Sequence, residues 1–219
     1  MEGLADDVFR IGLKPRAGLN AYLLGDILVD AGTQRSAPRL LRALEGRAVA
    51  AHAVTHAHAD HAGGSRRVAD ALGVPVWAGA GDVPFLEAGR VAEGARLLTL
   101  TLGSFPAVAP ARRLHEGDEI GGGFVTLDVP GHTPGHVAFW READRTLAVG
   151  DVVFNMHPAT TRAGLREPPR LFSVDPAGNR RSLRRLAALE PALVLFGHGP
   201  PLSDPARLSA FAASLPRDT

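Results

Sequence analysis

The sequence contains no cysteine and only one lysine, Lys14, among its 219 residues. Without cysteine, the chain cannot form disulfide bonds, thiolate zinc sites or iron–sulfur clusters, and it has no cysteine nucleophile. Any bound metal must therefore be held by histidine nitrogens and carboxylate oxygens. The charges of the 24 basic and 23 acidic residues nearly cancel. The chain therefore lacks the excess of positive charge that would indicate a nucleic-acid partner.

Long hydrophobic runs are also missing. No apolar stretch approaches the roughly 20 residues of a membrane-spanning helix. The first seven residues lack the basic and apolar regions of a signal peptide. We therefore expect a cytoplasmic protein with no membrane partner. The length and the 45% apolar content predict one folded domain over residues 1–219, and no pattern indicates an oligomeric state.

The hydrophobic periodicity predicts an α/β fold, because strand-like runs alternate with helical ones in two similar halves. A long loop is expected from Phe154 to Gly178, where proline and arginine are frequent, and segment 92–111 stays unassigned. The expected strands cover 8–13, 21–24, 27–29, 49–55, 74–78, 124–129, 137–140, 146–149 and 193–196. The expected helices cover 34–44, 65–72, 82–89, 180–189 and 205–215.

The strongest signal is the sequence His-Ala-His-Ala-Asp-His at residues 56–61, directly after an expected strand. Residues two apart in extended backbone point to the same side, so His56 and His58 can approach one metal together. Asp60 and His61 follow as the chain turns and can serve a second metal. The alternative is a polar loop whose histidines bond only to backbone or solvent.

Three further segments place a metal-ligand type of side chain beside glycine at the end of an expected strand. They are Gly-His-Thr-Pro-Gly-His at 131–136, Gly-Asp at 150–151 and Gly-His-Gly at 197–199. In open α/β sheets the carboxyl ends of the strands are the usual place for ligands, and glycine lets the backbone approach closely. The four segments together indicate one site containing His132, Asp151 and His198 besides the 56–61 motif.

This arrangement resembles the metallo-β-lactamase superfamily. The resemblance covers nearly the whole chain, from Asn-Ala-Tyr-Leu-Leu at 20–24 and Val-Asp-Ala-Gly at 29–32 to the last Gly-His-Gly. The His-x-His-x-Asp-His motif is specific for the superfamily, but not for one reaction. The resemblance implies an αβ/βα four-layer sandwich, with two mixed β-sheets flanked by helices and a metal site along one edge.

Carried over to this sequence, the resemblance implies two metal sites that share one carboxylate. The first site is held by His56, His58 and His132, the second by Asp60, His61 and His198, and Asp151 bridges the two. The expected cofactors are two divalent ions. Zinc is the first expectation, and iron and manganese are alternatives, because imidazole and carboxylate accept all three.

The expected reaction is hydrolysis of a small thioester, ester or lactone, with a small molecule as the only expected partner. A hydroxide bridging the two ions is expected to attack the carbonyl group. Asp60 and Asp151 are the expected catalytic residues, and Asp60 orients the nucleophile on this interpretation.

Two residues outside the ligand set have open roles. Asp30 either accepts the N–H of a metal-binding histidine or caps the helix expected near residue 34. His136 either supports the site or packs beside its loop. Two other histidines, His52 and His115, are expected to be structural or exposed.

The expected long loop supplies the substrate candidates Phe154 and His157, although a solvated histidine is equally compatible with the sequence. Its arginines either grip an anionic group or form a solvated charged face, and they lie at positions 162, 166 and 170. Residues 84–111 form a second candidate wall of the substrate site.

Branches of the superfamily differ at a few positions. Asp151 disfavours true β-lactamases, which generally lack the bridging aspartate. Only 21 residues follow His198, which leaves no room for the helical domain of the longer glyoxalase II-like enzymes. Phe154 stands where related lactonases often carry tyrosine. A mononuclear-iron persulfide dioxygenase and a phosphodiesterase of the same fold are the alternative activities.

Overall fold

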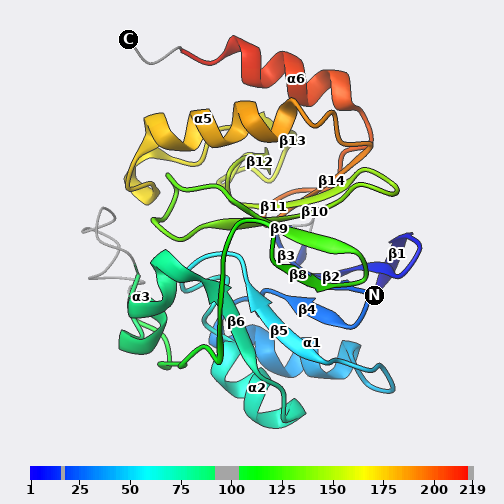
Figure 1. Ribbon diagram of the computed structural model, residues 1–219, viewed down its shortest axis with the longest axis vertical. Helices are drawn as coiled ribbons and strands as arrows, with labels where there is room; N and C mark the ends of the chain where they lie inside the picture. Colours follow the sequence, from blue (N-terminus) through cyan, green and yellow to red (C-terminus); the bar gives the residue numbers. More distant parts are fainter. Residues whose placement is uncertain (16–17, 92–103, 217–219) are drawn as a thin grey trace.

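The computed structural model describes residues 1–15, 18–91 and 104–216 as four stacked layers (Figure 1). Two β-sheets lie face to face in the middle. Helices α5 (Pro176–Ala187) and α6 (Pro205–Ser214) cover the outer face of one sheet. Helices α1 (Ala37–Ala43) and α2 (Ser65–Leu72) cover the outer face of the other. The expected αβ/βα sandwich with two mixed sheets is therefore confirmed.

The first sheet has seven strands in chain order, β1 to β7. Strands β1 to β4 pair antiparallel, and strands β4 to β7 pair parallel. The parallel strands are connected by crossovers, which contain the helices. The 3₁₀ turns η2 (Gln34–Ser36) and η3 (Ala80–Asp82) and the short helix α3 (Val83–Ala88) lie in these crossovers. The strands are β1 (Glu2–Ala5), β2 (Val8–Lys14), β3 (Leu19–Leu24), β4 (Ile27–Val29), β5 (Ala51–Val54), β6 (Val76–Gly79) and β7 (Arg112–Leu114).

The second sheet has five strands in the order β14-β11-β10-β9-β8. Its members pair antiparallel except for β11 and β14, which run parallel. The strands are β8 (Glu119–Gly121), β9 (Phe124–Asp128), β10 (Val137–Arg141), β11 (Thr146–Gly150) and β14 (Leu193–Phe196).

Alternation of side chains explains why both faces of each sheet are covered. In β3, Tyr22 packs between the two sheets, whereas Leu23 packs toward α1 and α2. In β10, Phe139 packs between the sheets, whereas Trp140 packs toward α5 and α6. Successive residues of a strand point to opposite faces, so strands that are apolar throughout need a layer on each side.

Strand directions bring the predicted ligand segments to one edge. Strands β9 and β11 both run antiparallel to β10, and β14 runs parallel to β11, so β9, β11 and β14 end at the same edge. The N–H of Val137, at the start of β10, donates to Thr55 O just after β5, at 2.9 Å. This bond places the end of β5 beside the same edge.

The prediction of an unstructured loop from Phe154 to Gly178 is wrong in part. The segment contains the strand pair β12 (Phe154–Met156) and β13 (Ala163–Arg166), the turn η4 (Arg170–Phe172) and the start of α5. Short strands were predictable where they are apolar throughout, as at 27–29 and 193–196, whereas these two strands contain polar residues or glycine. For the same reason β1, β7 and β8 were not predicted, and residues 92–103 of the unassigned segment lie outside the described residues.

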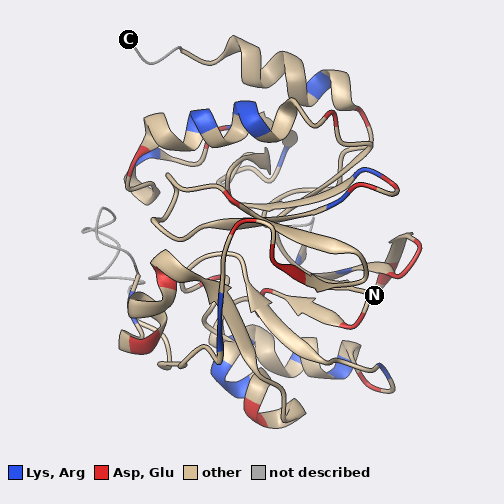
Figure 2. Cartoon of the chain, viewed as in Figure 1, with Lys and Arg blue, Asp and Glu red and all other residues tan. Residues whose placement is uncertain are grey.

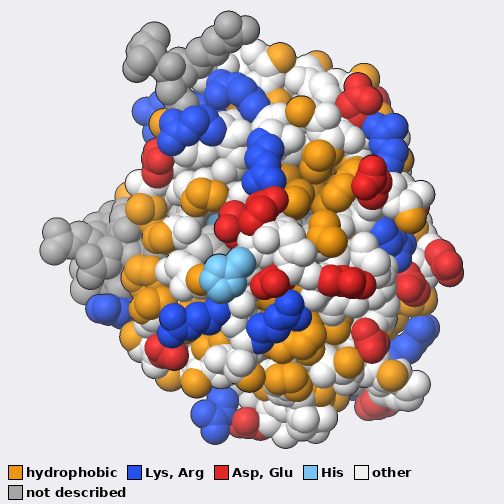
Figure 3. Space-filling model, in the orientation of Figure 1, with side chains coloured by type: hydrophobic (Ala, Val, Ile, Leu, Met, Phe, Trp, Pro, Cys, Tyr) orange, Lys and Arg blue, Asp and Glu red, His pale blue; other side chains and the backbone are white. Residues whose placement is uncertain are grey.

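Charged side chains of both signs are distributed over the surface. Basic residues lie on α1, α2 and α5, at opposite ends of the molecule (Figure 2). On the face shown in Figure 3, basic and acidic side chains are interspersed. No helix in the described part of the chain is long and apolar enough to span a membrane.

Candidate metal centre

The four predicted segments meet at the shared edge and bring seven side chains of metal-ligand type together. Within each of three groups, the candidate ligand atoms lie within 4.8 Å of one another. The groups are His56, His58 and His132; His56, His61 and Asp151; and Asp60, His61 and His198. The first and third correspond to the two sites implied by the resemblance.

Asp151 lies between the groups. Its Oδ2 is 3.8 Å from His56 Nε2 and 3.7 Å from His132 Nε2 on one side. On the other side it is 3.2 Å from His61 Nε2 and 3.3 Å from His198 Nε2. One buried carboxylate therefore faces both sets of imidazoles, as a bridging ligand must.

Several buried atoms in the centre have no hydrogen-bond partner. They include His56 Nε2, His132 Nε2 and Asp151 Oδ1. Buried polar atoms are nearly always paired, so the unpaired nitrogens of His56 and His132, which both face Asp151 Oδ2, need an explanation. A cation coordinated by these nitrogens and this carboxylate would satisfy them, and the donor set therefore fits a metal.

Asp30 holds His61 in place. Its Oδ2 lies 2.7 Å from His61 Nδ1, and its carboxylate also accepts hydrogen bonds from the N–H and hydroxyl of Thr55. The Thr55 hydroxyl is in turn 3.0 Å from His56 Nδ1. The alternative role as a helix cap is not observed, because Thr33 and Ser36 bond to each other at the start of η2.

Two further candidate ligand rings, those of His132 and His198, are also fixed through their Nδ1 atoms. His132 Nδ1 is 3.0 Å from the hydroxyl of Ser173. His198 Nδ1 donates to the carbonyl oxygen of Gly18 at 2.8 Å. Such contacts set the orientation of a metal-binding imidazole and leave its Nε2 free toward the site.

Electrostatics divide the histidines into two kinds. Burial lowers the pKa of His56 and His132 well below the usual value and lowers the pKa of His58 to about 4, so these rings are neutral. Burial also disfavours the charged form of His198, but Asp151 and Asp60 outweigh it and raise its pKa to about 10. A metal ion bound through His198 Nε2 would have to displace the proton that this ring carries.

The pKa of His61 is shifted in the same direction as that of His198. Against the effect of burial, Asp151 and Asp30 raise its pKa well above the usual value. Burial favours the neutral form of Asp151, yet the charges of His61 and His198 hold its pKa well below the usual value. The Asp151 carboxylate is therefore ionised, as a ligand of a cation must be.

His136 is adjacent to the ligands. Its Nε2 accepts the backbone N–H of Asp151 at 3.1 Å, and its ring stacks on His56 with centroids 4.7 Å apart. Among the three remaining histidines, His52 is buried between Leu28 O and the hydroxyl of Ser65, and His115 is exposed. Both are structural or exposed, as predicted.

A cavity of about 330 Å³ opens beside the centre. His58, Asp60, His132, Asp151 and His198 form its floor, and its walls are mostly apolar. The wall residues that bear on specificity are Lys14, Val91, Phe154, Met156 and Phe172.

The structure separates the substrate candidates. Phe154 lines the cavity, and its ring centroid is 4.6 Å from that of His198. His157 is not among the lining residues; its Nδ1 instead accepts backbone N–H groups of Ala159 and Thr160. Lys14 is the only Lys or Arg in the described lining, so the arginines at 162, 166 and 170 are not part of it. Nothing in the sequence marked Lys14 as a residue of the site.

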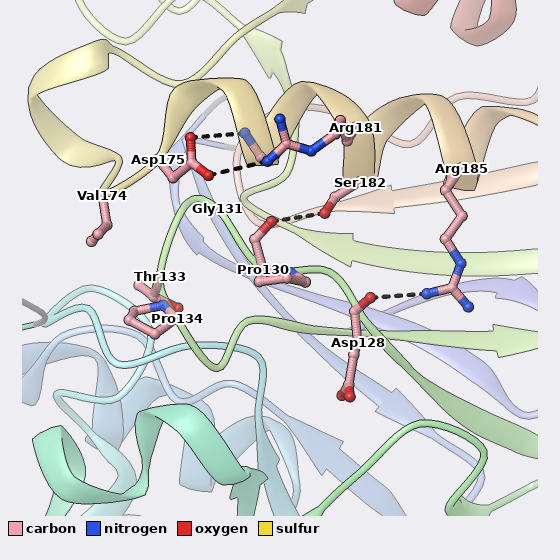
Figure 4. A pocket seen from close by; sticks show the side chains of 11 residues that line it. Asp128, Pro130, Gly131, Thr133, Pro134, Val174, Asp175, Arg181, Ser182 and Arg185 are labelled. Atoms are coloured by element: carbon pink, nitrogen blue, oxygen red, sulfur yellow. Dashed lines mark hydrogen bonds and ion pairs between the residues drawn. The ribbon is translucent and has the colours of Figure 1, made fainter. Parts of the chain in front are cut away.

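The loop that carries His132 is hydrogen-bonded from outside by α5 and by the two residues directly before it (Figure 4). Backbone N–H groups of Val174 and Asp175 donate to His132 O and Gly131 O, and the hydroxyl of Ser182 donates to Pro130 O at 2.8 Å. A Cβ on Gly131 would lie 2.1 Å from the backbone nitrogen of Asn179, so only glycine allows this contact.

Comparisons with known proteins agree with this geometry. The model of the metallo-beta-lactamase superfamily matches residues 17–198. Probable metallo-hydrolase YflN of Bacillus subtilis (strain 168) is 29% identical over 209 residues, which cover 81% of this chain and 76% of that protein. The hydroxyacylglutathione hydrolase of Methylococcus capsulatus is 34% identical over 145 residues, which cover 65% of this chain but 44% of that enzyme.

A solved structure, TTHA1623 in a di-iron-bound form, is 32% identical and has a TM-score of 0.71. The match covers 95% of this chain and 99% of that chain. The likeness therefore extends over almost the whole of both proteins.

Proposed function

The chain belongs to the metallo-beta-lactamase superfamily, and on that premise we propose that it is a dinuclear metal-dependent hydrolase of a small thioester, ester or lactone. Family membership supports a metal-dependent hydrolase. The observation that carries the finer proposal is the convergence of two three-residue groups on one buried carboxylate, Asp151. The relative named as a hydroxyacylglutathione hydrolase supports thioester chemistry.

Two divalent ions bound by these groups would supply a hydroxide near neutral pH and polarise a carbonyl oxygen. His56, His58 and His132 would hold the first ion, and Asp60, His61 and His198 the second. Zinc fits a set of nitrogen and oxygen ligands. The di-iron-bound relative makes iron the principal alternative.

The two aspartates have different tasks on this proposal. Asp151 is almost fully buried and keeps both groups at a common centre through Oδ2. Asp60 lines the cavity and is only partly exposed, with Oδ2 3.3 Å from His198 Nε2. It is placed to accept a hydrogen bond from the attacking water and to orient it toward the substrate.

The cavity supports a small substrate with an apolar part. Its volume of about 330 Å³ is at the lower end of ligand pockets. Phe154, Met156 and Phe172 provide apolar walls, and Lys14 provides one positive charge. We expect the preferred ester to carry a carboxylate or another anionic group that reaches Lys14.

The test combines metal analysis with a substrate panel. Purified protein is assayed with anionic and neutral thioesters, esters and lactones, and also with β-lactams, phosphodiesters and glutathione persulfide. Two zinc ions per chain with ester or thioester cleavage support the proposal. One iron ion with oxygen consumption on the persulfide overturns it.

Variants locate the activity. Asp151→Ala should lose both metal ions and turnover, and His58→Ala should lose the first ion and turnover. His115→Ala, at an exposed histidine outside the centre, should retain metal and turnover. Lys14→Met should raise KM for the anionic ester and leave the neutral ester unaffected. Full activity in a metal-free Asp151→Ala protein would refute the mechanism.

A further inference from the structure

We propose that Asp82 is a positioning residue that fixes the distance between the two loops carrying His56, His58 and His132, and that it thereby determines the affinity of the first metal site. The inference rests on the metal binding proposed above and is independent of the substrate. Asp82 ends the turn η3, and it was not predicted to belong to the site.

The Asp82 carboxylate is a buried acceptor for both loops. Its Oδ2 accepts the backbone N–H of Ala57 at 2.7 Å and the hydroxyl of Thr133 at 2.6 Å, and its Oδ1 accepts the N–H of Gly135 at 2.7 Å. Ala57 lies between His56 and His58, and Thr133 follows His132. One side chain therefore joins the two loops directly behind their ligands.

Close backbone approach makes this contact possible. A Cβ on Gly79 would lie 2.0 Å from Gly135 O, and a Cβ on Gly135 would lie 2.1 Å from the backbone nitrogen of Asp82. A Cβ on Gly81 would lie 2.9 Å from Gly135 Cα. The glycines thus let the 131–136 loop lie directly against η3, where the short Asp82 side chain reaches it.

The donor pattern requires a carboxylate. All three groups that face Asp82 are donors, and an ionised carboxylate is an acceptor at both oxygens. The Asp82→Asn side chain keeps the size but turns an NH₂ group toward one of these donors. A buried donor that loses its partner pushes the loops apart, because it can regain hydrogen bonds only by moving.

The second ligand group has separate supports. Asn20, at the start of β3, donates through Nδ2 to Phe196 O at 2.9 Å and to Gly199 O at 2.8 Å. These two carbonyls flank His198. Asn20 is therefore the counterpart of Asp82 for the second group, and it provides a matched comparison.

The experiment measures zinc affinity when only one group is intact. His198→Ala impairs the second group and leaves the first, whereas His58→Ala impairs the first and leaves the second. Asp82→Asn and Asn20→Ala are each added to both backgrounds. Metal-free proteins are titrated with zinc in competition with a chromophoric chelator, and their folding is checked by circular dichroism.

Asp82→Asn should weaken zinc binding about 10-fold or more in the His198→Ala background, a loss comparable to that of other residues that support metal ligands. In the His58→Ala background its effect should be less than about 2-fold. Asn20→Ala should give the opposite pattern. Should Asp82→Asn not fold, Thr133→Val removes one of the three bonds and should show the same selectivity on a smaller scale.

Equal weakening of both groups would overturn the proposal, since it would mean that Asp82 only stabilises the fold. Unchanged affinity in both backgrounds would overturn it as well. If the parent protein binds no zinc or iron at all, the proposed function fails instead, and the two failures are thereby distinguished.

Discussion

Gly197, immediately before His198, leaves no room for a side chain. A Cβ at this position would lie 2.3 Å from Asp151 Oδ1 and 2.5 Å from His61 Cε1, about 1 Å short of ordinary van der Waals contact. The backbone of Gly197 is not in the left-handed region, so alanine can adopt its conformation and the effect is purely steric. Gly197→Ala must therefore displace both of these side chains or the backbone that carries the new Cβ.

Metal sites tolerate ligand displacements of only about 0.2 Å. A shift of about 1 Å should therefore remove at least one metal ion per chain from the Gly197→Ala protein. Overpacking of this kind should also lower the free energy of unfolding by about 1–3 kcal/mol. Metal content is measured by elemental analysis, and stability of the metal-free protein by urea denaturation.

Gly12→Ala is the matched control, because a Cβ on this strand residue would have no neighbour within 4 Å. It should leave metal content unchanged. The reasoning would be refuted if Gly197→Ala bound metal as tightly as the parent protein and unfolded at the same urea concentration as Gly12→Ala.

Three further predictions concern stability. Chelation of the metals should lower Tm reversibly in a thermal melt, since a free ion at 1,000 times its Kd stabilises the folded protein by about 4 kcal/mol. Burial lowers the pKa of His52, so below pH 6.5 the unfolded chain binds a proton that the folded chain does not. Urea titrations from pH 6.5 to 5.5 should therefore show the parent losing up to about 1 kcal/mol relative to His52→Asn. Arg141→Met, which breaks partly exposed ion pairs with Asp7 and Asp144, should cost about 1–2 kcal/mol with unchanged metal content.

The convergence of the candidate ligands was predictable because its chemistry is local. The 56–61 motif places four ligand-type residues within six positions, and the segments around His132, Asp151 and His198 each follow a strand with a clear hydrophobic pattern. Strand ends that share an edge bring such segments together without further information. The structure accordingly joins all seven side chains.

The supporting residues could not be predicted, because their roles depend on which loops come to lie side by side. Asp82 reaches the His132 loop only through the close packing of Gly79, Gly81 and Gly135. Lys14 stands at the end of β2, where the neighbouring residues show no binding motif. Only its position in the cavity lining indicates a role in binding. Asp30 was assigned two possible roles, and only its contact with His61 decided between them.

The contact between Asn20 and the turn that carries His198 has a consequence for folding. It joins residues separated by 176 and 179 positions, between the first sheet and the last strand of the second. Contacts of such long range form late, because the entropy of closing the loop must be overcome first. During synthesis from the N-terminus, the 56–61 motif leaves the ribosome well before its partners do. If the chain binds two ions as proposed, complete metal loading requires that both ends of the chain have met, and a folding intermediate should bind metal weakly or in the wrong number.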